Sequence, residues 1–283
     1  MARSDIFVST QWLTDQLGRD DVIVVDGSYY LATMNRDAGA EYLAAHIPGA
    51  VRFDIDAVKD MTSGLPHMLP GAEQFARQVG AMGIADDMTI IVYDGAGLFS
   101  APRVRWTFQT FGAGHVRILD GGFPKWQMEG RTIETGPQQP RAPRVFNAVL
   151  DATAVASLAD VKAMLSDKTA QVVDARPAGR FDGTAPEPRP NLPSGHMPGS
   201  INLPFAEIIE NGQLKDEATI LNAMANAGID LDQPVVTSCG SGVSAAILST
   251  AMEMVGKPPK ALYDGSWAEY GSQPDAHIRT AEE

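Results

Sequence analysis

A buried strand followed by a tight loop is predicted for the segment Val235-Val236-Thr237-Ser238-Cys239-Gly240-Ser241-Gly242-Val243-Ser244. Its apolar start is typical of a strand that is covered on both faces within a parallel sheet. The run from Ala245 to Met252, which follows directly, is compatible with a helix. A strand, a loop and a helix in this order form part of a right-handed crossover. The segment therefore predicts an α/β fold.

The same pattern occurs earlier in the chain. Met82 to Gly97 aligns with Ala227 to Gly242 at a constant offset of 145 residues, which places Asp94 where the later copy has Cys239. Three further pairs of landmarks keep nearly this separation and the same order: Val24-Val25-Asp26 with Val172-Val173-Asp174, His46-Ile47-Pro48-Gly49 with His196-Met197-Pro198-Gly199, and Asp120-Gly121 with Asp264-Gly265. A repeated series of this kind predicts two homologous domains.

A proline-rich stretch separates the two copies. Glu134 to Pro143 contains three prolines and no hydrophobic periodicity, which favours an extended and fairly stiff connector. We predict a first domain over residues 1–135, a linker over 136–148 and a second domain over 149–283.

Within each copy, short apolar runs alternate with helical patterns. The runs at 23–25, 90–93, 172–173 and 235–236 are predicted strands. Apolar residues spaced as on one face of a helix lie between them: Phe75, Val79 and Met82 in one copy, and Ile220, Met224 and Ala227 in the other. Each domain is therefore predicted to be a mostly parallel sheet with helices on both faces. Such sheets bind ligands beyond the carboxyl ends of their strands, where Cys239 lies.

The composition is that of an ordinary globular protein. Hydrophobic residues make up 44% and charged residues 20% of the 283 residues, which is enough chain for two domains. The formal net charge of −13 disfavours nucleic acid or an anionic membrane as the main partner. The first residues lack the apolar core of a secretion signal, and no apolar run is long enough to span a bilayer. We therefore expect a cytoplasmic protein.

Cys239 is the only cysteine, so an intramolecular disulfide and a cysteine-rich metal site are both excluded. Gly240 and Gly242 allow the loop to curl until several backbone N–H groups face one point. The positive end of the following helix should further favour the thiolate form of the cysteine. A buried, inert cysteine is the alternative, but the strand–cysteine–Gly-x-Gly–helix context favours a nucleophile.

The charge of the loop bears on what this nucleophile attacks. Cysteine phosphatases close their loop with an arginine, and here no Arg or Lys lies between Cys239 and Lys257. The absence of a cation disfavours a phosphate ester and also a dianionic donor such as thiosulfate. A singly charged organic sulfur donor is favoured.

With these features, the two halves resemble tandem rhodanese domains. The loop from Cys239 to Val243 is similar to the active-site loop of 3-mercaptopyruvate sulfurtransferases rather than to the basic loop of thiosulfate sulfurtransferases. The likeness extends through Ser9-Thr10-Gln11-Trp12-Leu13, His46-Ile47-Pro48-Gly49-Ala50, Ser100-Ala101-Pro102-Arg103-Val104 and Asp264-Gly265-Ser266-Trp267. The resemblance implies that the first domain is a non-catalytic copy, with Asp94 in place of the cysteine.

The resemblance also implies an activity and a set of site residues. A sulfur atom would pass from 3-mercaptopyruvate through a persulfide on Cys239 to a thiol, a thioredoxin-like protein or cyanide, with release of pyruvate. Arg180 and Arg189 would hold the donor, a role that suits planar guanidinium groups. The loop residues Gly240, Gly242, Val243 and Ser244 would stabilise charge on sulfur through their backbone. We expect no metal and no organic cofactor.

A proton relay is the remaining implied part of the site. It would consist of Ser241, His67 and Asp56, with the last two contributed by the first domain. Gly64 stands at a position that is often proline in the family, which predicts a looser loop around His67. Ser244 stands where threonine is usual and keeps the hydroxyl group.

Two other interpretations of the sequence stay open. One is a rhodanese that prefers thiosulfate, and the other is a sulfur carrier or protein-binding module with little turnover. His46 and His196 recur in both halves and are interpreted as structural. The chain is expected to be a monomer or a weak dimer.

Overall fold

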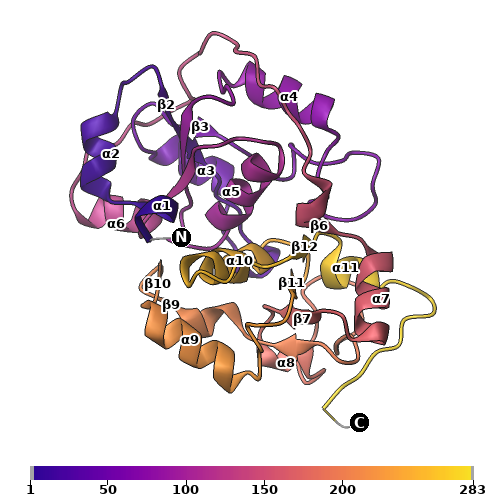
Figure 1. Ribbon diagram of the computed structural model, residues 1–283. Coiled ribbons are helices and arrows are strands. Elements are labelled where there is room, and N and C mark those ends of the chain that lie inside the picture. Colours follow the sequence, from indigo (N-terminus) through magenta and orange to yellow (C-terminus); the bar gives the residue numbers. More distant parts are fainter. Residues whose placement is uncertain (1–2, 282–283) are drawn as a thin grey trace.

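The computed structural model of the protein describes residues 3–281 and contains two five-stranded sheets with all strand pairs parallel (Figure 1). The first sheet has the order β1-β5-β4-β2-β3, and the second has the order β6-β12-β11-β7-β8. When only the five strands of each sheet are numbered along its half of the chain, both orders read 1-5-4-2-3. The predicted repeat and the predicted α/β class are therefore confirmed.

The strands are short, and the central ones are those that the sequence predicted. The first sheet consists of β1 (Phe7–Val8), β2 (Val22–Asp26), β3 (Val51–Arg52), β4 (Thr89–Tyr93) and β5 (Val116–Leu119). The second consists of β6 (Val155–Ala156), β7 (Gln171–Asp174), β8 (Ile201–Asn202), β11 (Val235–Ser238) and β12 (Ala261–Tyr263), and a small antiparallel hairpin of β9 (Ile209–Glu210) and β10 (Gln213–Leu214) lies beside it.

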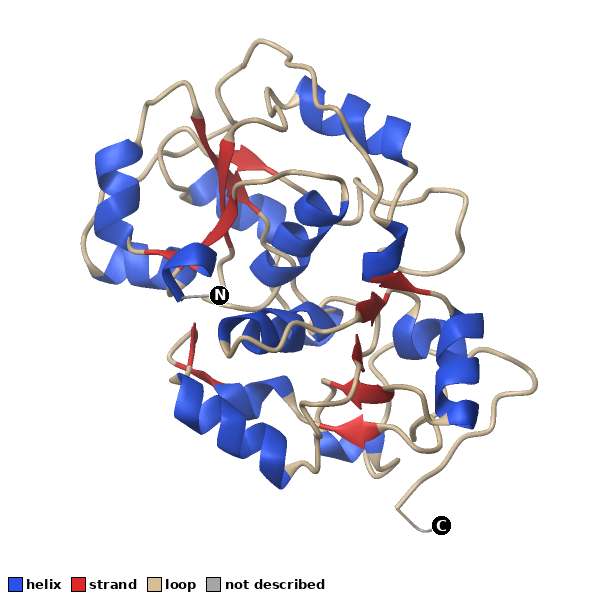
Figure 2. Ribbon diagram, in the orientation of Figure 1, coloured by secondary structure: helices blue, strands red, loops and turns tan. Residues whose placement is uncertain are grey.

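The helices connect these strands and cover both faces of each sheet (Figure 2). In the first half they are α1 (Arg3–Ile6), α2 (Thr10–Gln16), the 3₁₀ turn η1 (Ala32–Met34), α3 (Ala38–Ala44), α4 (Ala72–Ala81), α5 (Ala101–Thr110) and α6 (Gly122–Met128). In the second half they are η2 (Ala152–Ala154), α7 (Leu158–Asp167), α8 (Ala178–Phe181), η3 (Phe205–Ile208), α9 (Glu217–Asn226), α10 (Ala245–Met254) and α11 (Ser266–Tyr270). The two predicted helical stripes lie on α4 and α9.

Alternation along the strands divides the core into layers. In β2, Val24 packs with Leu13, Tyr42 and Trp126 of α2, α3 and α6 on one face. The neighbouring Val25 belongs to the cluster on the opposite face. The sequence run looks continuously apolar because both faces of the strand are buried.

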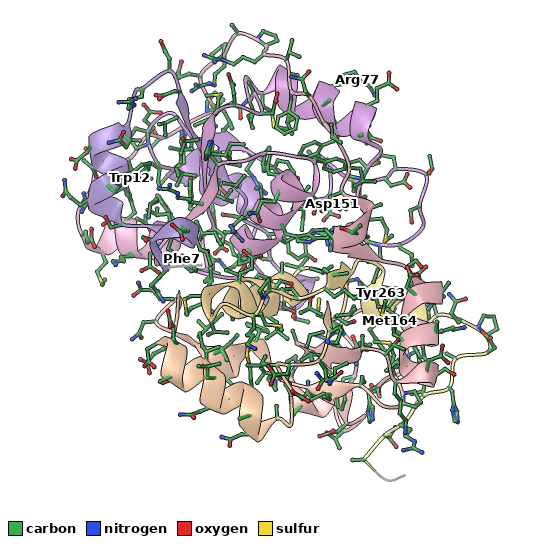
Figure 3. The ribbon with its side chains drawn as sticks, in the orientation of Figure 1. Phe7, Trp12, Arg77, Asp151, Met164 and Tyr263 are labelled. Atoms are coloured by element: carbon green, nitrogen blue, oxygen red, sulfur yellow. The ribbon has the colours of Figure 1, made fainter. Side chains whose placement is uncertain are left out.

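The two halves share one interior. Nearly every residue of α5 and α10 is buried, and these helices pack against each other between the sheets, with α10 crossing the middle of the molecule (Figure 1). Side chains of both halves fill this region (Figure 3), and a single apolar cluster includes residues from both. An ion pair of 2.8 Å between Arg105 and Glu253 also joins the two helices. The domain interface is therefore a core rather than a hinge surface.

The predicted linker contains no helix or strand and lies along the first domain. The backbone N–H of Arg144 donates to the carbonyl of Gly80 on α4 at 2.9 Å, and the ring of Phe146 packs edge-on against Phe75. The segment is extended, but its contacts with the first domain, rather than proline stiffness alone, hold it in place. The division at 1–135, 136–148 and 149–283 remains our proposal for the domain boundaries.

Candidate active site

Cys239 begins the loop between β11 and α10, at the carboxyl edge of the second sheet, and is 2% exposed. The backbone N–H groups of Cys239 and Gly242 both donate to Oγ of Ser266, at 3.1 Å each. Ser266 is buried and has a φ of 49°, an unusual value for a residue with a side chain. Strain of this kind persists where the surroundings enforce it, and here it shapes the cysteine loop.

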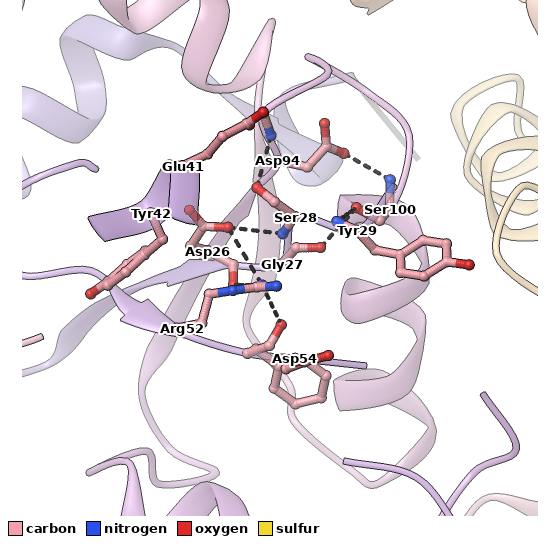
Figure 4. A network of polar contacts seen from close by, with 12 residues as sticks. Asp26, Gly27, Ser28, Tyr29, Glu41, Tyr42, Arg52, Asp54, Asp94 and Ser100 are labelled. Carbon is pink, nitrogen blue, oxygen red and sulfur yellow. Dashed lines mark hydrogen bonds and ion pairs between the residues drawn. The ribbon is translucent and has the colours of Figure 1, made fainter. Parts of the chain in front are cut away.

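The first domain contains the same turn with its anion in place. Oδ2 of Asp94 accepts hydrogen bonds from the N–H groups of Phe99, Ser100 and Ala101 at 2.7–2.8 Å, and Oδ1 accepts one from Ala96 at 2.9 Å. Figure 4 shows the bond from Ser100. A buried carboxylate thus satisfies the amides of the turn that precedes α5.

The second domain offers the corresponding amides without such an acceptor. None of the hydrogen bonds formed among residues 3–281 uses the N–H groups of Ser241, Val243, Ser244 or Ala245. The φ of Gly242 is 76°, which agrees with the predicted need for glycine there. The loop can therefore bind an anion beside Cys239, as the turn before α5 binds the Asp94 carboxylate.

Two guanidinium groups lie against this loop. A Cβ atom on Gly240 would lie 2.9 Å from Nη2 of Arg180 and 3.7 Å from Nη1 of Arg189. Glycine at this position therefore allows both arginines to approach the cysteine. The loop itself has no cation, as its sequence shows, but α8 contributes Arg180 to the site and the segment after α8 contributes Arg189. The uncharged sequence of the loop therefore does not by itself decide whether the site favours a singly or a doubly charged donor.

Arg189 stands between two members of the predicted relay. Its Nη2 donates to Oγ of Ser241 at 2.9 Å and lies 3.2 Å from Nε2 of His67. Nδ1 of His67 lies 3.1 Å from Oδ1 of Asp56, at ion-pair distance but not aligned for a hydrogen bond. The structure brings the three relay residues together, but it connects Ser241 to His67 through Arg189 rather than directly.

The protonation states of the relay follow from its surroundings. Burial lowers the pKa of His67, and the neighbouring Asp56 opposes this effect. The interaction with His67, supported by Lys59, lowers the pKa of Asp56 to about 2. The resting site therefore contains a neutral imidazole beside a carboxylate. The ring of Tyr29 packs edge-on against that of His67, at 4.8 Å between centroids.

The loop that carries His67 is fastened to the second domain. Nη2 of Arg103, from α5, donates to the carbonyl of His67 at 2.6 Å and forms an ion pair of 2.7 Å with Asp264. The other carboxylate oxygen of Asp264 accepts from the N–H of Leu69 at 2.8 Å. His67 is only 4% exposed. The looser loop expected from Gly64 stays a prediction.

A chain of buried ion pairs stands behind Arg180. Glu187 accepts a bidentate pair of hydrogen bonds from Nε and Nη2 of Arg180 and a third, at 2.8 Å, from Arg176. The guanidinium of Arg176 in turn donates to both carboxylate oxygens of Asp174. Asp174 belongs to a landmark that the sequence repeats. It accepts a hydrogen bond from the backbone N–H of Arg176, and it also ends this ion-pair chain.

A cavity of about 400 Å³ opens onto Cys239 between the two domains. Its polar end contains the cysteine loop and the two arginines. The rest of the wall is mainly apolar and comes from both domains: Leu31, Met34, Leu98, Phe99, Pro177, Phe205, Ile209 and Val243. Phe99 and Phe205 lie 5.7 Å apart across the domain interface.

His46 and His196 lie outside this cavity and have matching structural roles. Nδ1 of each bonds to a backbone carbonyl, of Tyr42 at 2.8 Å and of Phe181 at 2.9 Å. Each imidazole also stacks on the ring of the same residue. The structural interpretation of the two repeated histidines is confirmed.

Sequence reasoning missed four residues that shape the site, namely Glu187, Ser266, Arg103 and Asp264. Glu187 lies within the Arg180–Arg189 segment, and Asp264 belongs to a repeated landmark. The sequence therefore drew attention to both places but did not indicate what these two residues do.

Residues 3–281 contain no group of three or more His, Cys, Asp or Glu side chains that could hold a metal ion. In the same range, no helix has both the length and the apolar character needed to cross a bilayer.

Comparisons with known proteins agree with this fold and site. A family model described as a rhodanese-like domain matches residues 9–129 and 157–273. The 3-mercaptopyruvate sulfurtransferase of Escherichia coli (strain K12) is 41% identical over 274 residues, which cover 96% of this chain and 97% of that protein. The Homo sapiens protein of the same name is 41% identical over 270 residues, with 93% and 91% covered. The crystal structure of SseA from Escherichia coli has a TM-score of 0.85 at 39% identity, over 92% of this chain and 98% of that chain. The chain therefore belongs to the rhodanese family, with one copy of the domain in each half.

Proposed function

We infer that the protein is a sulfurtransferase that takes sulfur from 3-mercaptopyruvate and passes it to an external acceptor. The observation that carries this inference is the position of Cys239, between a set of unused backbone amides and two arginines in one cavity. The names of the relatives from Escherichia coli and Homo sapiens support the choice of donor.

In the first step, the Cys239 thiolate attacks the sulfur of the donor. The new bond joins the two sulfur atoms, the carbon–sulfur bond of the donor breaks, and its electron pair goes to the carbon that becomes the enolate of pyruvate. Arg180 and Arg189 hold the carboxylate and the adjacent ketone through directed hydrogen bonds. The free amides of the loop stabilise the negative charge on the persulfide.

The enolate must then gain a proton. Ser241, His67 and Asp56 are the groups that would move it. In the resting site, Arg189 occupies the space between Ser241 and His67. A donor carboxylate that binds Arg189 draws its Nη2 away from the imidazole, so that Ser241 can bond directly to His67. The relay would thus be completed by the substrate itself.

In the second step, an acceptor nucleophile attacks the outer sulfur atom and leaves Cys239 as a thiolate. The chain has one cysteine, so the acceptor must come from outside. A low-molecular-weight thiol, a thioredoxin-like protein and cyanide are the proposed acceptors. The cavity is larger than the donor requires, and its apolar wall leaves room for the acceptor to approach the persulfide.

The test is steady-state pyruvate release from 3-mercaptopyruvate with a thiol acceptor, measured beside sulfur transfer from thiosulfate, for the wild type and Cys239→Ser. We expect the wild type to prefer 3-mercaptopyruvate and the variant to be inactive with both donors. Equal or better use of thiosulfate would support the second candidate, a thiosulfate-preferring rhodanese. That candidate is favoured by the pair of arginines and by an Arabidopsis thaliana relative named for both donors, 40% identical over 292 residues.

Inactivity with both donors would instead support the carrier interpretation. A carrier loaded by another protein would still accept sulfur on Cys239, which intact-protein mass spectrometry detects as one added sulfur atom.

The cytoplasm remains the proposed compartment, although the name of another Arabidopsis thaliana relative assigns that protein to mitochondria. The monomer or weak dimer also remains a proposal.

A further inference from the structure

We propose that Glu187, which the reaction itself does not use, sets the charge of the donor site and thereby selects a monoanionic donor over a dianionic one. The proposal rests on Arg180 and Arg189 being the donor-binding residues of the proposed function. It explains how a site with two arginines can still prefer 3-mercaptopyruvate.

The side chain of Glu187 is 1% exposed, and both of its oxygens face cations. Its bidentate contact with Arg180 uses Nε and Nη2 of the guanidinium, the edge that would otherwise present a fork to an anion. Glu187 therefore fixes the orientation of the Arg180 guanidinium and balances its positive charge before any donor binds.

The buried ion-pair chain is neutral as a whole. Asp174 and Glu187 supply two negative charges, and Arg176 and Arg180 supply two positive charges. Arg176 is additionally fixed over the ring of Trp267, at 4.4 Å from its centroid. Burial makes each of these charges costly to leave unpaired, so the chain acts as one unit.

The other charges around the loop are also paired. Arg103 forms an ion pair with Asp264, and Lys59 lies 3.3 Å from Asp56. Within residues 3–281, Arg189 has no carboxylate at ion-pair distance, and its contacts at the site are Ser241 and His67. Apart from the Cys239 thiolate, which is the attacking nucleophile, the charged side chains on the donor side of the cavity therefore leave one uncompensated positive charge, that of Arg189.

One positive charge matches the single carboxylate of 3-mercaptopyruvate. Thiosulfate carries two negative charges and would leave one of them uncompensated in a largely apolar cavity, which is unfavourable. A neutral side chain at position 187 would free the charge of Arg180 and make the site match a dianion. At the effective dielectric constant of a protein surface, a unit charge gained beside a bound anion changes its binding by about tenfold or more.

The test compares kcat/KM for thiosulfate and for 3-mercaptopyruvate, with the same acceptor, in the wild type and in Glu187→Gln. We expect the ratio of thiosulfate to 3-mercaptopyruvate to rise at least about tenfold. Glu187→Asp keeps the charge with a shorter reach, and its ratio should stay near that of the wild type even if both donors bind less well. Glu73→Gln removes an exposed carboxylate at the start of α4 and controls for net charge; its ratio should not change.

A purely structural role for Glu187 predicts a different outcome. Both donors would then lose activity together in Glu187→Gln, and an unchanged ratio would overturn the proposal. Arg180→Gln combined with Glu187→Gln restores the original charge without the ion pair, so its ratio should return toward the wild-type value. A double variant that keeps the raised ratio would also overturn the proposal.

A measurement on the wild type covers the case in which Glu187→Gln does not fold. Pyruvate is a monoanion and sulfate a dianion, and both can be tested as competitive inhibitors of 3-mercaptopyruvate. The proposal expects pyruvate to inhibit at the lower concentration, and the reverse order would contradict it.

Failure of the proposed function can be distinguished from failure of this proposal. If the wild type releases no pyruvate from 3-mercaptopyruvate, the proposed function itself is wrong. A wild type that prefers 3-mercaptopyruvate with an unchanged ratio in the variant refutes only the role of Glu187.

Discussion

Asp94 and Cys239 occupy the same place in the two domains, each directly after the central strand of its sheet and before a buried helix. The Asp94 carboxylate already accepts the backbone hydrogen bonds of its turn, whereas the amides around Cys239 are left for a ligand. The loop before α5 has one more residue than the loop before α10. The same kind of turn thus binds a carboxylate of its own chain in the first domain and leaves its amides open beside Cys239 in the second.

This relationship predicts a large loss of stability for Asp94→Ala. The substitution leaves four backbone N–H groups without their acceptor inside a buried turn, and each such group costs about 1–3 kcal/mol. We expect the free energy of unfolding to fall by about 3 kcal/mol or more, as measured by urea denaturation. Asp94→Asn retains one acceptor oxygen and should lose less. An alanine variant as stable as the wild type would show that the carboxylate does not hold the turn.

Replacement of Arg189 should weaken donor binding. Arg189→Gln removes the uncompensated guanidinium and its charge-assisted hydrogen bonds, which are worth about 1.5–3 kcal/mol. We therefore expect KM for 3-mercaptopyruvate to rise about tenfold to a hundredfold in steady-state assays of pyruvate release. Arg189→Lys keeps the charge but loses the planar guanidinium group, so its KM should lie between those of the wild type and Arg189→Gln. A KM within about twofold of the wild type in Arg189→Gln would exclude this arginine as a donor ligand.

The pH dependence of the reaction should report His67. Burial lowers the pKa of His67 below its ordinary value of about 6.5, so the imidazole is neutral near neutral pH. Activity that needs the neutral ring is full above this pKa and is lost as the pH falls through it. Asp56→Asn removes the group that raises the pKa of His67, so the acid limb of kcat/KM should move to lower pH. If the acid limb of kcat/KM stays at the same pH in Asp56→Asn, or persists in His67→Asn, the titrating group is not His67.

The same two groups make stability depend on pH in a defined direction. The folded-state pKa of His67 lies below its unfolded value, so the unfolded chain binds a proton first, and stability falls as the pH drops below about 6.5. Asp56 has a folded pKa of about 2, below its unfolded value, so its contribution is present above about pH 4 and is lost as the pH falls toward 2. Thermal midpoints of the wild type and His67→Asn across this range test both effects, because the variant removes the imidazole and also the interaction that lowers the pKa of Asp56. The higher-pH decline should be smaller in the variant.

The buried ion pair across the domain interface predicts a non-additive pair of mutations. Arg105 is 2% exposed, and Arg105→Leu removes the cation beside the Glu253 carboxylate, which should cost about 3 kcal/mol or more of folding free energy. The double variant Arg105→Leu/Glu253→Leu removes both charges and should recover most of that loss. Chemical denaturation of the four proteins gives the coupling energy. A loss in the double variant equal to the sum of the two single losses would show that the charges are not coupled.

The two-domain α/β fold could be predicted because its signals are local and occur twice. Apolar strand runs, helical spacing in α4 and α9, and glycines beside the cysteine depend only on near neighbours in the chain. Packing against the first domain governs the linker, and Ser266 acts on the cysteine loop from a different part of the second domain. Neither effect has a signal in the local sequence.

The sequence by itself determined the repeated fold and the place of the single cysteine, Cys239, between a strand and a helix, because these follow from residue type and short-range spacing. Only the tertiary structure decided the charge and connectivity of the site. Arg189 meets His67 across 122 residues of chain, and Leu69 meets Asp264 across 195. The cysteine loop contains no cation, but the fold places Arg180 and Arg189 beside it and pairs Arg180 with Glu187. The local sequence could not show these charges, because electrostatic interactions depend on distance in space and on burial.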